Sequence, residues 1–265
     1  MDSQKWLLYS TVHKWPISIG YKVEGTKLER EETRIANTFD YSIVVSDGEH
    51  KILKNLAPAA SSDWVPNGVD VDNYKPGTEP YDPNCISFIG RFDYYPNEQG
   101  AQWFCDAVLP KLLQRLPQMR LHLVGAEPSA RVRALAAHPN VEVTGTVPEV
   151  QPYVHRSLAT IAPLLIARGI QNKILESMAM AVPSVVSHES AKGVDAVPGE
   201  HLLACTSPEE YVDAIVRLAK NPELRQQIAT QGQQRASEFL TWERVMQRLD
   251  RVIETLSAKR AQTLG

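Results

Sequence analysis

Short apolar runs alternate with amphipathic helical stretches from Cys85 towards the C-terminus, and each run has four or five residues. Runs of this length, separated by helix-length segments, are typical of parallel strands joined by crossover helices. We therefore expect a doubly wound α/β domain, with a parallel sheet covered by helices on both faces. The expected strands are residues 85–89, 121–124, 141–144, 159–162, 183–186 and 201–204.

A segment rich in proline, residues 75–84, precedes this alternation. Its three prolines and one glycine interrupt regular structure, so we expect a linker and a domain boundary there. Upstream of it, the composition predicts helices at 26–37 and 47–56 and a strand at 39–46. Downstream, Ser207 and Glu210 have the spacing of a helix-capping box with Pro208 at the first helical position, and Asn221 before Pro222 predicts a further helix start in the same way.

Composition excludes several classes of partner. The net charge of -3 over 265 residues gives no reason to expect nucleic acid. The three cysteines are far apart and form no CxxC pair, which indicates reduced thiols and no zinc site. No apolar run reaches the ~18 residues that a membrane span needs, so we expect a cytoplasmic protein.

The leading segment carries many aromatic residues for its length, with Trp6, Tyr9, Trp15 and Tyr21 among them. This favours a face that packs against the rest of the protein. Contact with a membrane surface is the alternative that the residues leave open.

Residues 162–187 combine a buried element with a polar patch. The pattern predicts the end of a strand, a turn at Arg168 and Gly169, a short helix and a further strand from 183. The apolar residues that recur at helical spacing, and would face a sheet, are Ile170, Ile174 and Met178. The polar residues that share another face are Asn172, Lys173 and Glu176.

This polar face suits a nucleotide. Gly169 lets the backbone approach a ligand, and the first free N–H groups of the helix would suit a phosphate. Lys173 adds a positive charge, and the Glu176 carboxylate can accept from two neighbouring hydroxyls, as on a ribose. A solvated helix face with an internal Lys–Glu pair explains the spacing equally well.

Gly90 and Arg91, after the first strand beyond the linker, form a second candidate site, with a helix expected to start near Asn97. The glycine allows close approach, and the arginine can donate paired hydrogen bonds to a phosphate. Seen alone, such a pair is more often structural. The sequence has neither GxGxxG nor GxxxxGK[ST], and it has no HExxH or GxSxG motif.

Several motifs together identify a resemblance: VPNGVDVDNY, SFIGRFDYYPNEQGAQWF, LHLVGAEP, VEVTGTVPEVQPYV, APLLIARGIQNKILESMAMAVPSVVS and PGEHLLAC. In this order and spacing they resemble the donor half of a GT-B glycosyltransferase of family GT4. The ARGIQNKILE version is most similar to the sugar transferases associated with bacterial exopolysaccharide and exosortase (PEP-CTERM) systems. The resemblance covers nearly the whole chain.

The resemblance implies two facing Rossmann-like domains, with the nucleotide sugar held mainly by the C-terminal one. It implies a partial N-terminal, acceptor-side domain at 1–74, a linker at 75–84, a donor domain at 85–240, and a last helix at 241–265 that crosses back. Only the second half of the usual N-terminal domain has a counterpart here, so the resemblance suggests a truncation.

The resemblance also implies site residues. Gly90 and Arg91 would lie at the diphosphate, and Glu176 corresponds to the glutamate that holds the ribose hydroxyls. The backbone at Gly169 to Gln171 would approach the donor sugar and phosphates. The residues implied beside the base are Val147, Pro148 and Val150.

Two departures from the family pattern concern charge. Arg168 occupies the position of the first glutamate of the family's E-x7-E motif, and the lysine that usually follows the glycine-arginine loop is absent. We infer that Lys173, together with Arg168, supplies the missing positive charge to the diphosphate.

The resemblance implies retaining transfer from a nucleotide diphosphate sugar to a carbohydrate or polyprenyl-linked acceptor, with no metal and no cofactor besides the donor. Peripheral contact with the inner face of the membrane is compatible with such an acceptor. Two alternatives stay open: a non-catalytic nucleotide-sugar binding module, and a hydrolase or epimerase on the same fold.

Overall fold

The computed structural model describes residues 1–167 and 169–264, with side chains described as far as residue 258. The chain divides into two compact units. The first unit comprises Met1–Asn67, Arg168–Ile170 and Arg248–Gly265, and the second comprises Gly68–Ala167 and Gln171–Gln247. Each unit is described by itself below.

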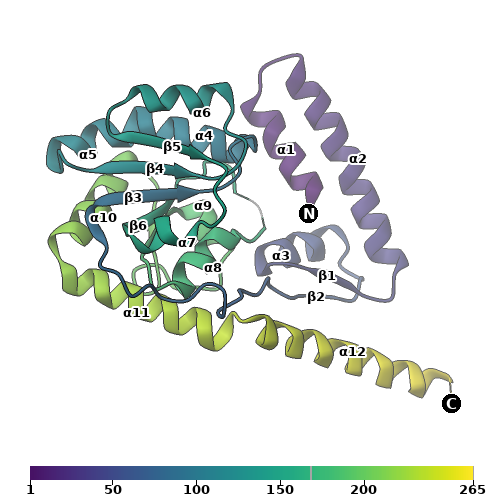
Figure 1. The fold of residues 1–265 in the computed structure, drawn as a ribbon. Coiled ribbons are helices and arrows are strands. Elements are labelled where there is room, and N and C mark those ends of the chain that lie inside the picture. The colour runs from purple at the N-terminus through teal and green to yellow at the C-terminus, as the bar shows by residue number, and fades with distance from the viewer. Residues whose placement is uncertain (168, 265) are drawn as a thin grey trace. The chain divides into compact units, whose positions relative to one another are not determined.

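The second unit is built on a six-stranded parallel sheet with the order β5-β4-β3-β6-β7-β8 (Figure 1). Numbered from β3, this is the 3-2-1-4-5-6 order of a doubly wound nucleotide-binding sheet. The expected fold class is therefore confirmed. The strands are β3 Asp82–Ile89, β4 Arg120–Val124, β5 Val141–Gly145, β6 Ser157–Ala162, β7 Ser184–Ser187 and β8 Leu203–Cys205.

Helices cover both faces of this sheet (Figure 1). Helices α4, α5 and α6 lie on one side, and α8 and α11 lie on the other. The helices that belong to this unit are α4 Tyr95–Trp103, α5 Leu109–Arg115, α6 Ala130–Ala134, α7 Gln151–His155, α8 Asn172–Ala179, α9 His188–Ala191, α10 Pro208–Lys220 and α11 Pro222–Phe239. A π-helical turn, Phe104–Val108, joins α4 to α5, and a 3₁₀ turn, Leu135–Ala137, follows α6.

The large core of this unit explains why its strands read as continuous apolar runs. All six residues of β6 are buried, as are the last five of β3. A strand that is covered on both faces has no solvent side, so its sequence does not alternate. Phe88, Phe92, Phe104 and Leu158 are among the fully buried side chains of the core.

The predicted helix starts in the C-terminal part are confirmed. Ser207 Oγ accepts a hydrogen bond from the Glu210 backbone N–H, at 3.2 Å, and begins α10. Asn221 Oδ1 accepts from the Leu224 N–H, at 2.9 Å, and begins α11. These side chains satisfy backbone donors that have no partner within the helix.

The first unit is smaller and mainly helical. Its elements are α1 Asp2–Val12, α2 Ile17–Thr38, β1 Ser42–Val44, α3 Asp47–Leu56 and β2 Ser62–Trp64. The two strands pair in parallel, with Ile43 opposite Asp63, and they form a sheet of their own. Its compact core cluster consists of Ala36, Leu53, Ala57 and Ala60, with Met1 and Val44 packed against it.

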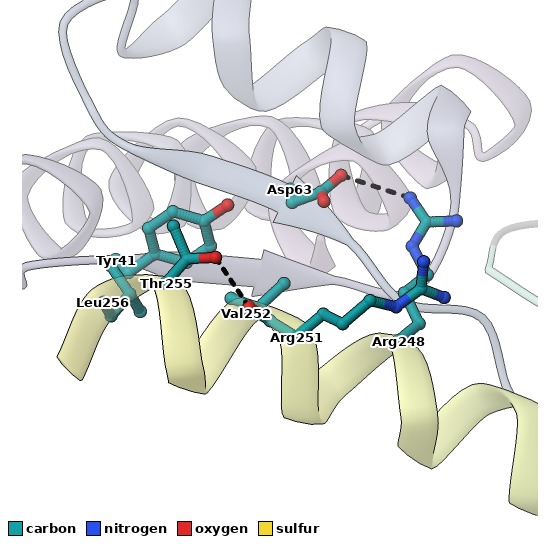
Figure 2. Close-up of a pocket in the computed structure, with 7 residues that line it drawn as sticks. All are labelled: Tyr41, Asp63, Arg248, Arg251, Val252, Thr255 and Leu256. Carbon is teal, nitrogen blue, oxygen red and sulfur yellow. Dashed lines mark hydrogen bonds and ion pairs between the residues drawn. The ribbon is translucent and has the colours of Figure 1, made fainter. Parts of the chain in front are cut away.

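Helix α12, Trp242–Leu264, contributes to both units: residues up to Gln247 belong to the second and those from Arg248 to the first. In the first unit, the Arg248 guanidinium lies 4.1 Å from the Trp64 ring and pairs with the Asp63 carboxylate at 3.2 Å. A pocket of about 450 Å³ lies beside this pair (Figure 2). It is lined by Tyr41, Asp63, Arg248, Arg251, Val252, Thr255 and Leu256.

Several predicted boundaries were wrong. The helix expected at 26–37 begins at Ile17, and a further helix, α1, precedes it. The strand expected at 39–46 is only Ser42–Val44, and β3 begins at Asp82, inside the segment predicted to be a linker. Strand β3 extends because β6 begins alongside it, with Asp82 opposite Ser157. No helix among the described residues is long and apolar enough to cross a membrane.

Candidate functional site

The site lies where the strand order of the second unit reverses. Strand β3 has β4 on one side and β6 on the other, so the connections after β3 and β6 leave the sheet towards opposite faces. A crevice forms at the carboxyl ends of such strands, and open α/β sheets bind ligands there. Gly90 follows β3 directly, and α8 is the helix after β6.

Two glycines hold the loop after β3 in close contact with its neighbour. The Gly90 N–H donates to the Val124 carbonyl at 3.0 Å. Gly125 has a φ of +142°, and a Cβ atom there would lie 2.0 Å from the Gly90 carbonyl oxygen. Only glycine allows this contact, so Gly125 fixes the path of the backbone at Gly90.

Lys173 reaches this loop from α8. Its Nζ donates to Asn97 Oδ1 at 2.7 Å and lies 4.7 Å from the centre of the Phe88 ring. A Cβ atom at Gly90 would be 3.0 Å from the same Nζ. Burial lowers the pKa of Lys173 to about 7, although Glu176 opposes this shift. The Lys173 amine thus stands beside the backbone of Gly90, where the resemblance implies a diphosphate.

Asn97 is a site residue that the sequence analysis did not identify. Its side chain is 5% exposed, and its Nδ2 donates to the Arg91 carbonyl at 2.8 Å while its Oδ1 accepts from Lys173. The amide therefore links the glycine-arginine loop to α8. The sequence signal was weak, because an asparagine after proline near a helix start is usually a turn or capping residue.

Glu176 lies one turn beyond Lys173, as the helical spacing predicted. The Tyr74 hydroxyl donates a hydrogen bond to its carboxylate. Burial raises the pKa of Glu176, while the Tyr74 hydrogen bond and the Lys173 charge act in the opposite direction. A half-buried carboxylate that already accepts one hydroxyl has the chemistry to accept a ribose hydroxyl.

Arg91 is exposed and engaged with two carboxylates. Its guanidinium contacts Asp93 at 2.9 Å and Glu127 at 2.6 Å. These carboxylates raise the pKa of Arg91, so the side chain stays charged. A phosphate would have to compete with both carboxylates for this guanidinium.

The residues expected beside a base lie in the loop between β5 and α7. Val150 packs at the edge of an apolar cluster that contains Ile89 and Met180, and Tyr74 packs against the same cluster. Val147 is half-buried and Pro148 is exposed. Because Tyr74 also bonds Glu176, the apolar cluster and the predicted ribose-binding carboxylate are neighbours.

The start of α8 differs from the expectation. The helix begins at Asn172, so Ile170 precedes it and is only half-buried, and the prediction that it faces the sheet was wrong. Ile174 and Met178 are buried as predicted. Gly169 has a φ of +63°, which glycine adopts without strain, but Gly169 and Ile170 fall in the first unit.

Two of the remaining candidate residues lie at the start of α8. Gln171 occupies the position before the helix, and Asn172 is exposed as its first residue. The predicted role of Arg168 falls outside the described residues. Among the described residues no group of three or more His, Cys, Asp or Glu side chains could hold a metal ion.

Comparison with known families identifies this arrangement. Residues 83–221 match the family described as glycosyl transferases group 1, and they make up just over half of the chain. The chain belongs to the glycosyl transferases group 1 family. The matched segment contains Gly90, Arg91, Asn97, Lys173 and Glu176.

A curated relative of this family member is the phosphatidyl-myo-inositol mannosyltransferase of Mycobacterium tuberculosis (strain CDC 1551 / Oshkosh). The two are 27% identical over 214 residues, which cover 75% of this chain and 55% of the relative. The chain thus spans about half the length of the curated relative that it matches.

Solved structures share the fold at low sequence identity, and they are GT-B glycosyltransferases. Sucrose-phosphate synthase from Thermosynechococcus elongatus matches with a TM-score of 0.73 and 19% identity, over 87% of this chain and 62% of that one. Anabaena Alr3699/HepE in complex with UDP and glucose matches with a TM-score of 0.69 and 18% identity, over 86% and 66%.

Proposed function

We propose that this chain binds a nucleotide diphosphate sugar and serves as the donor half of a retaining hexosyltransferase-type glycosyltransferase. The acceptor would be a carbohydrate or a polyprenyl-linked sugar in exopolysaccharide biosynthesis, in the cytoplasm or at the inner face of the membrane. The donor would be a substrate, with no separate cofactor or metal. Membership of the glycosyl transferases group 1 family supports the reaction class.

One observation carries the proposal. Lys173 on α8 reaches the Gly90 loop at the carboxyl edge of the sheet, where the strand order reverses, and Glu176 lies one turn further along the same helix. A cation beside a close-approach glycine suits a diphosphate, and a half-buried carboxylate one turn away suits a ribose. The two groups sit on one helix at a spacing that a nucleoside diphosphate would match.

The side chains then have separate tasks. Lys173 would hold positive charge against the diphosphate and stabilise the negative charge that develops as the nucleotide leaves. Arg91 would supply a second positive charge once its guanidinium gives up an ion pair with Asp93 or Glu127 and binds a phosphate instead. Glu176 would hold the ribose hydroxyls, beside the apolar cluster that includes Val150, which would contact the base with Val147 and Pro148.

The loop before α8 would complete the donor site. We propose that the backbone of Gly169, Ile170 and Gln171 approaches the sugar and phosphates, with Asn172 at the helix start. Arg168 would supply a further positive charge. Arg168 stands where the family pattern has a glutamate, so the contact that this glutamate makes with the donor sugar is not transferred to this chain.

A second candidate function is nucleotide-sugar binding without transfer. It is favoured by the share of the mannosyltransferase that the chain covers, which is 55%. We propose that residues 1–67 and the end of α12 correspond to part of an acceptor-side domain.

Calorimetric titration with UDP, GDP and their sugars tests the donor site. We expect one nucleotide to bind, and the Glu176→Ala variant to lose most of that affinity. Glu189→Ala is the matched control, because Glu189 is an exposed carboxylate on α9 that pairs with Lys192. If no nucleotide binds, or if both variants bind like the wild type, the proposed site is wrong. Consumption of the donor only in the presence of an acceptor would distinguish transfer from binding alone.

A further inference from the structure

Helices α1 and α2 form an antiparallel hairpin (Figure 1). Aromatic rings pack between the two helices. The Tyr21 ring lies 5.2 Å from Trp6 and 5.5 Å from Tyr9, and a Cβ atom at Gly25 would lie 2.8 Å from Leu7. These contacts all lie within the leading segment, so its aromatic residues pack against one another and not, as expected, against the rest of the protein. They also hold α1 against α2, so the turn between the two helices forms the tip of the hairpin.

The tip of this hairpin is apolar and exposed, which the packing interpretation did not predict. Trp15, between the two helices, is 77% exposed, and Ile17 and Ile19 at the start of α2 are 59% and 53% exposed. Val12 and Val23 are exposed as well. Large exposed apolar side chains close to one inter-helix turn indicate an interaction site. We call residues 12–23 the hairpin tip.

Charge is distributed unevenly along the hairpin. Between Ser3 and Val23 the sequence has three lysines and no aspartate or glutamate, although the whole chain has a net charge of -3. Two of these lysines, Lys14 and Lys22, are exposed at the hairpin tip. The remainder of α2, residues 24–34, carries four glutamates along with three basic residues. The tip is therefore apolar and basic, and the stem is of mixed charge.

We propose that the hairpin tip docks on the surface of an anionic lipid bilayer. Tryptophan favours the membrane–water interface, because its ring is apolar and its N–H can bond to polar groups. Aliphatic side chains would enter the boundary between headgroups and acyl chains, while Lys14 and Lys22 contact anionic headgroups. The contact is interfacial, since no helix among the described residues is suited to span a membrane.

The proposal is independent of the donor site. Trp15, Ile17 and Ile19 belong to the first unit, whereas Lys173 and Glu176 belong to the second. Nucleotide titration of every hairpin variant therefore checks that the second unit is unaffected. A failure of membrane binding would leave the donor site untouched, and a failure of nucleotide binding would leave the docking surface untouched.

Vesicle sedimentation tests the proposal with the full chain. Vesicles of phosphatidylcholine alone are compared with vesicles of equal parts phosphatidylcholine and phosphatidylglycerol. We expect binding to the anionic vesicles, weakened by salt. The Trp15→Ser/Ile19→Ser variant should lose about tenfold or more in partitioning, because two large apolar side chains no longer leave water. Lys14→Gln and Lys22→Gln should each lose about fivefold.

The matched control replaces exposed apolar residues elsewhere. Val197→Ser/Ile253→Ser removes two side chains that are also about half exposed, and it should bind vesicles like the wild type. Brominated acyl chains should quench tryptophan emission in the wild type and much less in Trp15→Phe, which keeps an apolar ring.

Several outcomes would overturn the proposal. They are absence of binding to either vesicle, binding that the hairpin variants do not alter, and quenching that Trp15→Phe leaves unchanged. A wild-type dimer in solution that Trp15→Ser/Ile19→Ser converts to a monomer would assign the hairpin tip to a second copy of the chain instead.

Discussion

The surroundings of Lys173 bring the pKa of its ammonium group close to neutral pH. Its pKa lies at about 7 because burial disfavours the ammonium, and its hydrogen-bond partner Asn97 is a neutral amide. An anionic diphosphate beside Nζ would favour the protonated form and raise this pKa. Binding of a donor should therefore be coupled to uptake of a proton.

This coupling predicts the pH dependence of donor affinity. Below the pKa of about 7 Lys173 is already charged, so affinity should be constant. Above it, affinity should fall by up to about tenfold per pH unit, because the free site must bind a proton before it matches the diphosphate. Calorimetry with a nucleotide sugar, whose phosphates do not titrate in this range, measures the slope.

Two variants separate this effect from other titrations. Lys173→Gln should bind weakly with no such slope. Asn97→Asp places a carboxylate at the Nζ, so the fall in affinity should begin about one pH unit or more higher. A slope that persists in Lys173→Gln, or a profile that Asn97→Asp does not move, would assign the titration to another group.

Gly125 is predicted to be intolerant of any side chain. A Cβ atom 2.0 Å from the Gly90 carbonyl forces one loop to move, and the φ of +142° adds strain. We expect Gly125→Ala to lower the free energy of unfolding by about 1–3 kcal/mol and to weaken nucleotide binding. Urea denaturation and calorimetry measure the two effects.

Gly145→Ala is the control for Gly125→Ala. Gly145 also has a positive φ, of +69°, but a Cβ atom there would meet nothing within 4 Å. The Gly145→Ala variant should lose less stability than Gly125→Ala and should bind the nucleotide with unchanged affinity. Equal effects in the two variants would mean that backbone strain alone, and not the contact with Gly90, explains the requirement for glycine.

At the scale of elements, helix starts are determined locally. Helix α10 begins with Ser207, and the Glu210 carboxylate reaches back to the Thr206 backbone N–H at 2.7 Å. Hydrogen bonds from the Thr206 and Ser207 backbones lower the pKa of Glu210, and the second of these is the one expected of a capping box, in which the glutamate reaches the N–H of the cap residue. Donors at the helix start are therefore satisfied without tertiary contacts.

Ser207→Ala should therefore destabilise the protein by about 1 kcal/mol, through loss of the hydrogen bond to the Glu210 N–H. Denaturant unfolding measures the change. Ser61→Ala, an exposed loop position before β2, should alter stability by less than about 0.5 kcal/mol. A loss in Ser207→Ala no larger than in this control would contradict the capping role.

At the scale of the whole molecule, the two units differ in how much apolar surface they bury. The core of the second unit includes Ile86, Leu121 and Leu158, each fully buried, whereas a core cluster described for the first consists of one leucine and three alanines. A two-stranded sheet with a small core is marginal by itself. Stability should therefore be unequal along the chain.

Hydrogen exchange should show this inequality. We expect the amides of β3, β4 and β6 to exchange slowest, through global unfolding, and those of β1 and β2 to exchange by local opening at lower free energy. Mass spectrometry of peptic fragments measures both. Equal protection of β1 and β3 would mean that the two units unfold as one.

The sequence by itself determined the doubly wound fold, the starts of α10 and α11, and the shared face of Lys173 and Glu176. Each depends on residues close together in the chain, through helical or strand periodicity and capping. The tertiary structure alone decided which groups meet from a distance. Asn97 and Lys173 are 76 residues apart, and Tyr74 reaches Glu176 from before β3.

The same distinction explains what was missed. The partner of Lys173 depends on β6 lying next to β3, and no local pattern records that adjacency. Trp15 and Trp6 are both tryptophans of the leading segment, yet Trp15 is exposed at the hairpin tip and Trp6 packs on Tyr21. Burial is a property of the packed structure, because it depends on which surfaces the folded chain brings together.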